Sequence, residues 1–192
     1  MPRLRPLVAA LVAVLAVSPL AAQPGASAPP PCSGAEHRQF DFWLGDWDVE
    51  ANGRIAGRNR ITRLFGDCGV REEYVGARGG YVGSSFNLWD ASRGVWHQTW
   101  VDNQGLLLLI EGRFEGGRMV LSGRLSDGAG GSSLERITWT PSADGTLRQH
   151  WESSKDDGAS WTTVFDGLYR PHLEAPASGD SGPPPTDPAP GA

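Results

Sequence analysis

Polar side chains that could contact a ligand stand beside aromatic residues in several segments of this sequence. In three segments the polar and aromatic residues are two positions apart, and Glu135 stands four positions before Trp139, so on a strand each set would share one face. The predicted ligand-contacting residues are Glu72, Tyr74, Gln98, Trp100, Glu135, Gln149 and Trp151. Aromatic faces can stack on a ring, and amides and carboxylates can form hydrogen bonds. The pattern therefore predicts a cavity that binds a small aromatic or sugar-like molecule.

Two other interpretations of the same residues stay open. Each buried polar group left without a partner costs about 1 to 3 kcal/mol, so these groups could instead pair with one another and with water in a filled barrel. The protein would then be a structural component of the cell envelope. Alternatively, Glu72 and Glu135 could act as the acid and base of a hydrolase-type enzyme if burial raised one pKa. We favour ligand binding over catalysis and assign no catalytic residue.

Other residue types that support chemistry lack a suitable spacing. The four histidines do not have the spacing of metal ligands, so we expect no metal. An axial haem ligand would have to point into the barrel, whereas His97 and His150 are expected to face solvent and His172 begins the tail, so we expect no cofactor. These histidines are His37, His97, His150 and His172. The 17 basic and 22 acidic residues give a net charge of −5, which argues against a nucleic-acid partner. The small-molecule ligand is thus the one partner we expect, and the oligomeric state is left open.

The segments that carry these residues are short and end in turn sequences about every eleven residues. The nine turns lie at 52–53, 66–67, 79–80, 92–94, 103–105, 116–117, 127–131, 144–145 and 157–158. They delimit ten segments in which apolar and polar residues alternate with a period of two, as in strands. One short helical turn within 36–42 precedes them. Ten short antiparallel strands lose their unpaired edges by closing, so we predict an all-β up-and-down barrel. A two-sheet sandwich is the alternative.

The predicted inward faces follow from this alternation. They comprise Val70, Glu72 and Tyr74; Trp96, Gln98 and Trp100; Glu135, Ile137 and Trp139; Leu147, Gln149 and Trp151; and Trp161, Thr163 and Phe165. The 154–161 segment also fits the Asp-box pattern of sialidase-like propellers, in which an aspartate accepts backbone N–H groups, a glycine adopts positive φ and a tryptophan packs beneath. A propeller repeats this motif, whereas one copy indicates a hairpin built on Asp156, Gly158 and Trp161.

A Gly45-Asp46-Trp47 motif follows the aromatic run 40–44 directly. With the segments 96–102 and 151–169, it resembles the lipocalin-like or calycin barrels, and more specifically a bacterial family of exported calycin-like proteins. The resemblance covers most of residues 32–170 and implies a barrel whose closed end is plugged by Trp47. It also implies that a basic residue of the last strand, here Arg170, stacks over that tryptophan. It leaves the activity open.

Four regions divide the chain. Arg3 and Arg5, an apolar run to Val17 and the small residues before Gln23 predict a cleaved signal peptide over 1–22. Proline-rich segments over 23–31 and 171–192 flank the barrel domain at 32–170, and we expect both to be disordered. The mature protein would be periplasmic or secreted, without a transmembrane span. In that oxidising environment we predict a disulfide between Cys32 and Cys68.

Overall fold

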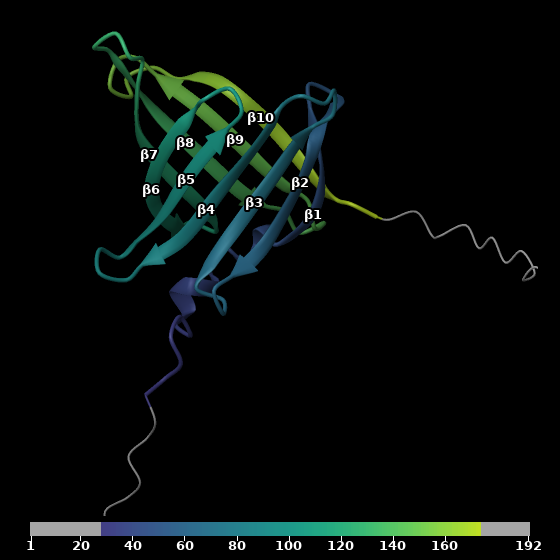
Figure 1. The fold of residues 1–192 in the computed structure, drawn as a ribbon, viewed down its shortest axis with the longest axis vertical. Coiled ribbons are helices and arrows are strands. Elements are labelled where there is room, and N and C mark those ends of the chain that lie inside the picture. The colour runs from purple at the N-terminus through teal and green to yellow at the C-terminus, as the bar shows by residue number, and fades with distance from the viewer. Residues whose placement is uncertain (1–27, 174–192) are drawn as a thin grey trace, which may run out of the picture.

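The chain forms one closed barrel of ten antiparallel strands (Figure 1), as the computed structural model shows for residues 28–173. The strands are β1 (Gly45–Ala51), β2 (Arg54–Leu64), β3 (Gly69–Gly76), β4 (Val82–Asp90), β5 (Val95–Asp102), β6 (Leu107–Glu115), β7 (Arg118–Ser126), β8 (Ser132–Pro141), β9 (Leu147–Ser154) and β10 (Thr162–Pro171). The predicted all-β up-and-down barrel is confirmed. The predicted signal peptide and most of both proline-rich segments lie outside the described residues.

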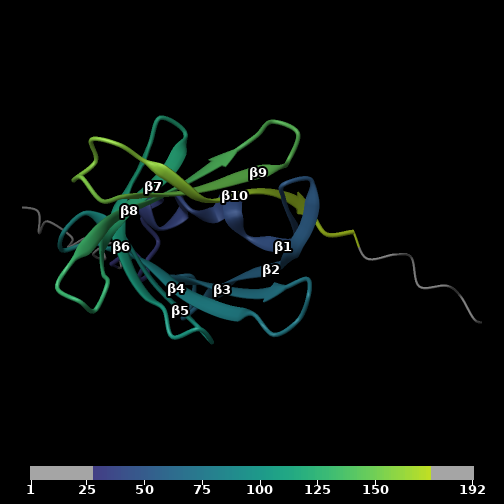
Figure 2. The ribbon, with the colours of Figure 1, turned by 90° about the horizontal axis from the view of Figure 1, so that it is seen from above.

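Each strand pairs with the next one in the chain, and β1 pairs with β10 to close the ring, as the view along the barrel shows (Figure 2). All nine predicted turns join neighbouring strands. The turn between β1 and β2 has Asn52 at φ 51° and Gly53 at φ 71°, the left-handed conformation that a two-residue hairpin loop requires. Closure pairs the backbone of every strand on both sides, so the sheet has no open edge.

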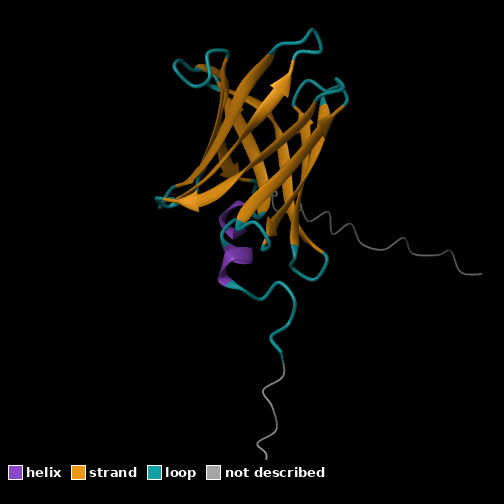
Figure 3. Ribbon diagram, turned by 90° about the vertical axis from the view of Figure 1, so that its left-hand side faces the viewer, coloured by secondary structure: helices purple, strands orange, loops and turns teal. Residues whose placement is uncertain are grey.

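A helical plug covers the end of the barrel where β1 begins, which we name the capped end (Figure 3). Two short 3-10 helices, η1 (Ala35–Arg38) and η2 (Asp41–Trp43), form the predicted helical turn. Phe40 lies between the two helices and Trp43 ends η2. Both side chains are fully buried, and their rings stack with centroids 4.8 Å apart. Phe40 also meets Trp139 edge-on at 5.2 Å. This aromatic cluster fills the capped end.

The predicted disulfide between Cys32 and Cys68 is present. It joins the segment before η1 to the turn before β3, so it holds the helical plug against the capped end. Closing this loop removes chain entropy from the unfolded state, which stabilises the fold by about 4 kcal/mol. Within residues 28–173, no helix has the length and apolar character needed to cross a bilayer.

The barrel agrees with the calycin-like fold that the resemblance implied, but its capped end differs in one detail. Trp47 is buried, and its indole N–H donates to the carbonyl of Trp43 at 2.9 Å. The predicted cation over this ring is not formed, because Arg170 points outward and lies 3.2 Å from the carboxylate of Glu50. Tyr169, one residue earlier, is the residue of β10 that faces Trp47, with ring centroids 6.2 Å apart.

The start of β10 also corrects a prediction. The register of β10 against β9 shifts between Thr163 and Phe165, so an extra residue changes the alternation of side chains there. The Thr163 hydroxyl therefore lies outside, 3.1 Å from the ring of His150, and not inside as predicted. Trp161 also lies outside the lumen, beneath the guanidinium of Arg136 at 3.9 Å. Only Phe165 keeps the inward position expected for this segment.

The hairpin between β9 and β10 has the geometry predicted from the single Asp-box copy. The Asp156 carboxylate accepts the backbone N–H of Ser160 at 2.8 Å, and Gly158 has φ +90°. The Trp161 indole N–H donates to the carbonyl of Gly158 at 3.1 Å. The motif therefore forms one turn at the end of the barrel opposite the plug, which we name the far end.

Candidate functional site

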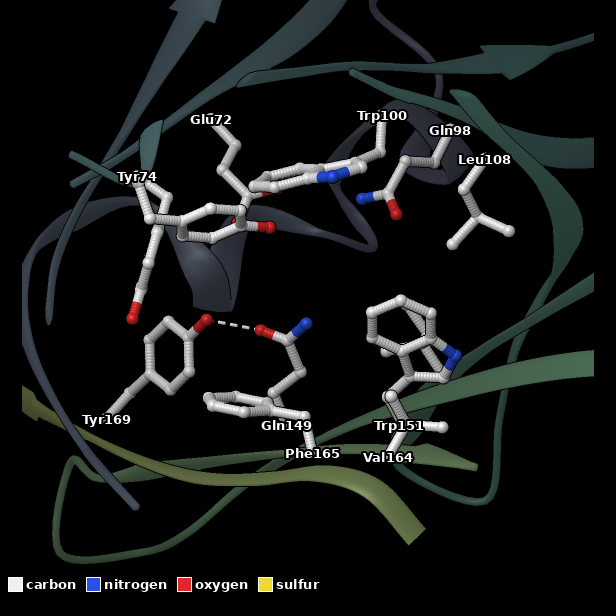
Figure 4. Close-up of a pocket in the computed structure, with 12 residues that line it drawn as sticks. Glu72, Tyr74, Gln98, Trp100, Leu108, Gln149, Trp151, Val164, Phe165 and Tyr169 are labelled. Atoms are coloured by element: carbon white, nitrogen blue, oxygen red, sulfur yellow. Dashed lines mark hydrogen bonds between the residues drawn. The ribbon is translucent and has the colours of Figure 1, made fainter. Parts of the chain in front are cut away.

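A cavity of about 230 Å³ occupies the lumen towards the far end (Figure 4). It is lined by Glu72, Tyr74, Tyr81, Gln98, Trp100, Leu108, Ile137, Gln149, Trp151, Val164, Phe165 and Tyr169. Six of the seven predicted ligand-contacting residues are in this set, and Glu135 is the exception. The alternation on β3, β5 and β9 therefore brings these residues together from three separate parts of the ring.

Two of the aromatic walls depend on glycines of the neighbouring strands. A Cβ on Gly83 would lie 2.2 Å from Cζ2 of Trp100, and a Cβ on Gly57 would lie 2.5 Å from the hydroxyl of Tyr74. Any larger residue at either position would displace the ring. The glycines thus let both rings lie over the backbone of the adjacent strand, which leaves the lumen open.

Glu72, on β3, is the buried acid of the cavity, and its side chain is 3% exposed. One carboxylate oxygen accepts the amide N–H of Asn59 at 2.7 Å, and the other accepts the hydroxyl of Ser85 at 2.7 Å. Burial raises the pKa of Glu72 to about 7, because the loss of hydration outweighs the two hydrogen bonds that favour the charged form. Near neutral pH this carboxyl group is therefore close to half ionised.

A chain of polar side chains extends from Glu72 along the wall. The Gln98 amide donates to Oδ1 of Asn87 at 2.7 Å, and the Asn87 amide donates to Oγ of Ser85 at 2.9 Å and to the carbonyl of Val70 at 3.2 Å. These bonds fix the orientation of Gln98. Among residues 28–173, no group donates to its Oε1, which faces the lumen (Figure 4).

Tyr169 and Gln149, on the neighbouring strands β10 and β9, form a second polar pair in the cavity wall (Figure 4). The Tyr169 hydroxyl donates to Oε1 of Gln149 and accepts the amide N–H of Asn59 at 3.2 Å. In the described part of the chain, no acceptor pairs with Nε2 of Gln149. The cavity therefore presents one unused amide donor from Gln149 and one unused amide acceptor from Gln98.

Glu135 lies outside the cavity lining because nearby side chains take up its carboxylate. It accepts the hydroxyls of Ser133 at 2.5 Å and Ser153 at 2.7 Å, and the indole N–H of Trp151 at 2.6 Å. Its strand, β8, is also separated from β3 by four strands in either direction around the ring. Within residues 28–173 the carboxylates of Glu72 and Glu135 share no hydrogen-bond partner, and only that of Glu72 lines the cavity. Glu135 orients Trp151 instead.

Several residues of the site were absent from the prediction. Tyr169 could have been found, because it continues the inward alternation from Phe165 through Gly167. Asn59 gave no such signal, since arginines stand on both sides of it. Ser85 and Asn87 gave a misleading one, since the apolar residues beside them, Phe86 and Leu88, are the exposed ones.

The sequence matches no model of a known protein family and no curated protein. Among the described residues, no group of three or more His, Cys, Asp or Glu side chains could hold a metal ion.

Proposed function

We propose that this protein binds a small molecule with a flat apolar face and hydrogen-bonding groups inside its barrel. The observation that supports this is the cavity of about 230 Å³, with aromatic walls and two unused amide groups. An apolar protein cavity of about 150 Å³ can already hold benzene, so this one has room for a substituted aromatic ring or one sugar ring.

A filled structural barrel is the competing interpretation, and two features count against it. A barrel filled by its own side chains would leave space for no more than a water or two. The unused donor of Gln149 and acceptor of Gln98 also face the lumen, where an uncompensated amide is costly. A bare acyl chain would leave both amides unpaired, so a ligand with polar substituents fits better.

We also propose that the protein works outside the cytoplasm. The disulfide between Cys32 and Cys68 supports this, because such bonds persist in oxidising compartments and are rare in the cytosol. The order of charged, apolar and small residues over 1–22 supports a secretory signal. N-terminal sequencing of the protein from the cell envelope should begin at Gln23, and an intact Met1 in the cytosol would refute export.

The binding function can be tested while the natural ligand is unidentified. Native mass spectrometry of the protein purified from its own host should show a bound small molecule. In parallel, 2-phenylethanol and methyl β-glucoside serve as probes of ring binding, with tryptophan fluorescence as the signal. We expect at least one to quench the emission, and Trp100→Ala to abolish the effect.

Trp89→Ala provides the matched control, since Trp89 lies on β4 but not in the cavity lining. It should keep the probe-dependent quenching, provided that circular dichroism confirms the fold of both variants. A protein free of any co-purified molecule that also binds neither probe would refute the proposal and favour the filled barrel.

A further inference from the structure

We infer that the ligand is a small aromatic molecule that carries a positively charged amino group, because the cavity combines one buried carboxylate with walls of aromatic rings. This inference rests on the proposed binding function and specifies its ligand class. Three properties of the cavity lead to it: its charge, the kind of surface that surrounds it, and the hydrogen-bonding capacity left on its carboxylate.

The charge of the lining favours a cation. Glu72 is the one carboxylic acid among the cavity-lining residues, and in the described part of the chain no lysine, arginine or histidine lines the cavity. An anionic ligand would therefore meet a carboxylate without any positive partner in a poorly hydrated space. A cation would instead compensate the buried charge of Glu72.

The walls provide a second source of attraction for a cation. Six of the twelve lining residues are aromatic, namely Tyr74, Tyr81, Trp100, Trp151, Phe165 and Tyr169. They come from both sides of the lumen, with Tyr74 and Trp100 facing Phe165 and Trp151 across it (Figure 4). The faces of such rings carry negative electrostatic potential, and cages of this kind bind ammonium groups.

The carboxylate of Glu72 also keeps room for a ligand donor. Each of its oxygens accepts one hydrogen bond, from Asn59 or from Ser85, and an ionised carboxylate has about four acceptor positions. One position on each oxygen therefore stays available to an ammonium N–H. The free Oε1 of Gln98 adds another acceptor, and the free Nε2 of Gln149 can pair with a ring substituent.

Binding of such a cation should be coupled to loss of a proton. The pKa of Glu72 is raised to about 7 by burial, and an ammonium group in contact would favour its ionised form. The other titratable groups of the lining are the phenols of Tyr74, Tyr81 and Tyr169, and burial raises the pKa of each. They stay neutral between pH 5 and 8, so the coupling reports on Glu72.

The test compares 2-phenylethylammonium with 2-phenylethanol, which have the same ring and linker but differ in charge. An alkylammonium group has a pKa of about 10, so the first probe is charged throughout the experiment. By calorimetry at pH 8 we expect the ammonium probe to bind at least tenfold more tightly than the alcohol. At pH 5.5 its affinity should fall at least tenfold, because Glu72 is then protonated.

The variant Glu72→Gln should remove both the preference for the ammonium probe and its pH dependence. Glu73→Gln is the matched control, because Glu73 is the next residue of β3 but lies outside, paired with Arg71 at 2.6 Å. If Glu72→Gln does not fold, the wild-type protein still decides the question. Titrations at pH 6 in buffers of different ionisation enthalpy should show release of close to one proton on binding.

The outcomes separate this inference from the function on which it rests. Equal affinities for the two probes, or tighter binding of the alcohol, would overturn the cation inference and leave ring binding intact. A preference for the ammonium probe that persists in Glu72→Gln would also overturn it. Failure of both probes to bind would overturn the inference together with the binding of simple ring ligands.

Discussion

The buried carboxyl group of Glu72 should make the protein less stable as the pH rises from about 4.5 to about 7. In the folded state its pKa is about 7, whereas an exposed glutamate has a pKa of 4.5. Between these values the folded state binds more protons than the unfolded state, so the free energy of unfolding falls as pH increases. Below pH 4.5 this effect is absent, and above pH 7 it is complete.

The size of the effect follows from the difference between the two pKa values. A shift of about 2.5 units (about 7 minus 4.5) corresponds to a maximum loss of about 3 kcal/mol, at 1.36 kcal/mol per unit. Between pH 5 and pH 8 the expected loss is about 2 kcal/mol, because a small part has already occurred at pH 5. Asp156, with a pKa lowered to about 2, stays ionised throughout this range and does not obscure the trend.

Urea unfolding followed by tryptophan fluorescence can measure this loss in the wild type and in Glu72→Gln. The difference between the two proteins isolates Glu72, because every other group contributes equally to both. We expect the stability of Glu72→Gln relative to wild type to increase by about 2 kcal/mol from pH 5 to pH 8. A difference that does not change with pH would show that Glu72 titrates normally and would refute the reasoning.

Three further predictions concern the cavity wall and the plug. Gly83→Ala should push the Trp100 ring into the lumen, since the new Cβ would lie 2.2 Å from that ring. The barrel should stay folded, and calorimetry should show at least tenfold weaker binding of 2-phenylethanol. An unchanged affinity would mean that the Trp100 ring does not form a wall of the site. Trp151→Phe removes the indole N–H that Glu135 accepts at 2.6 Å, so urea unfolding should show a loss of about 1 to 3 kcal/mol, and no loss would contradict the orienting role of this bond. Replacing both cysteines by serine should lower the free energy of unfolding by about 4 kcal/mol, and a loss below about 1 kcal/mol would argue against the loop-entropy account of the disulfide.

Much of the architecture could be predicted because turn chemistry and alternation are local properties of the chain. The turn at 52–53, for example, needs two residues that tolerate positive φ, and Asn52-Gly53 meets that need directly. The inward faces of β5 and β9 could be predicted because Gln98 and Gln149 each stand two residues from a tryptophan that shares their face.

The interior of β4 could not be predicted, because its pattern is reversed. Phe86 and Leu88 face outward and are 48% and 44% exposed, whereas Ser85 and Asn87 are buried. Hydrophobic alternation alone would place the two apolar residues inside. Asn59 raises a similar difficulty, since arginines stand on both sides of it and no apolar residue marks which face of the strand is buried. The buried polar chain depends on partners from other strands, which a single segment does not specify.

Three side chains differ from what the sequence predicted, each for a specific physical reason. Thr163 faces outward because β10 contains one extra residue before Phe165, and no glycine or proline stands at 163–165 to indicate this bulge. Glu135 was expected to face the ligand, but two serine hydroxyls and an indole N–H hold it within the wall. Arg170 forms an ion pair with Glu50 on the outside of the barrel, in place of the expected contact with Trp47.

In a closed ring every strand has two paired neighbours, so the ring could begin at any of its strands. The β1–β10 pairing is antiparallel like the nine hairpins, but it spans four residue pairs and no turn connects the two strands. A circular permutant could therefore join the chain ends by a linker and start at another hairpin, such as the exposed turn Gly116-Gly117 between β6 and β7. All ten strand pairings would be kept, together with the cavity. The cavity depends on the order of the strands around the ring, and several different orders of the strands along the chain would produce the same ring.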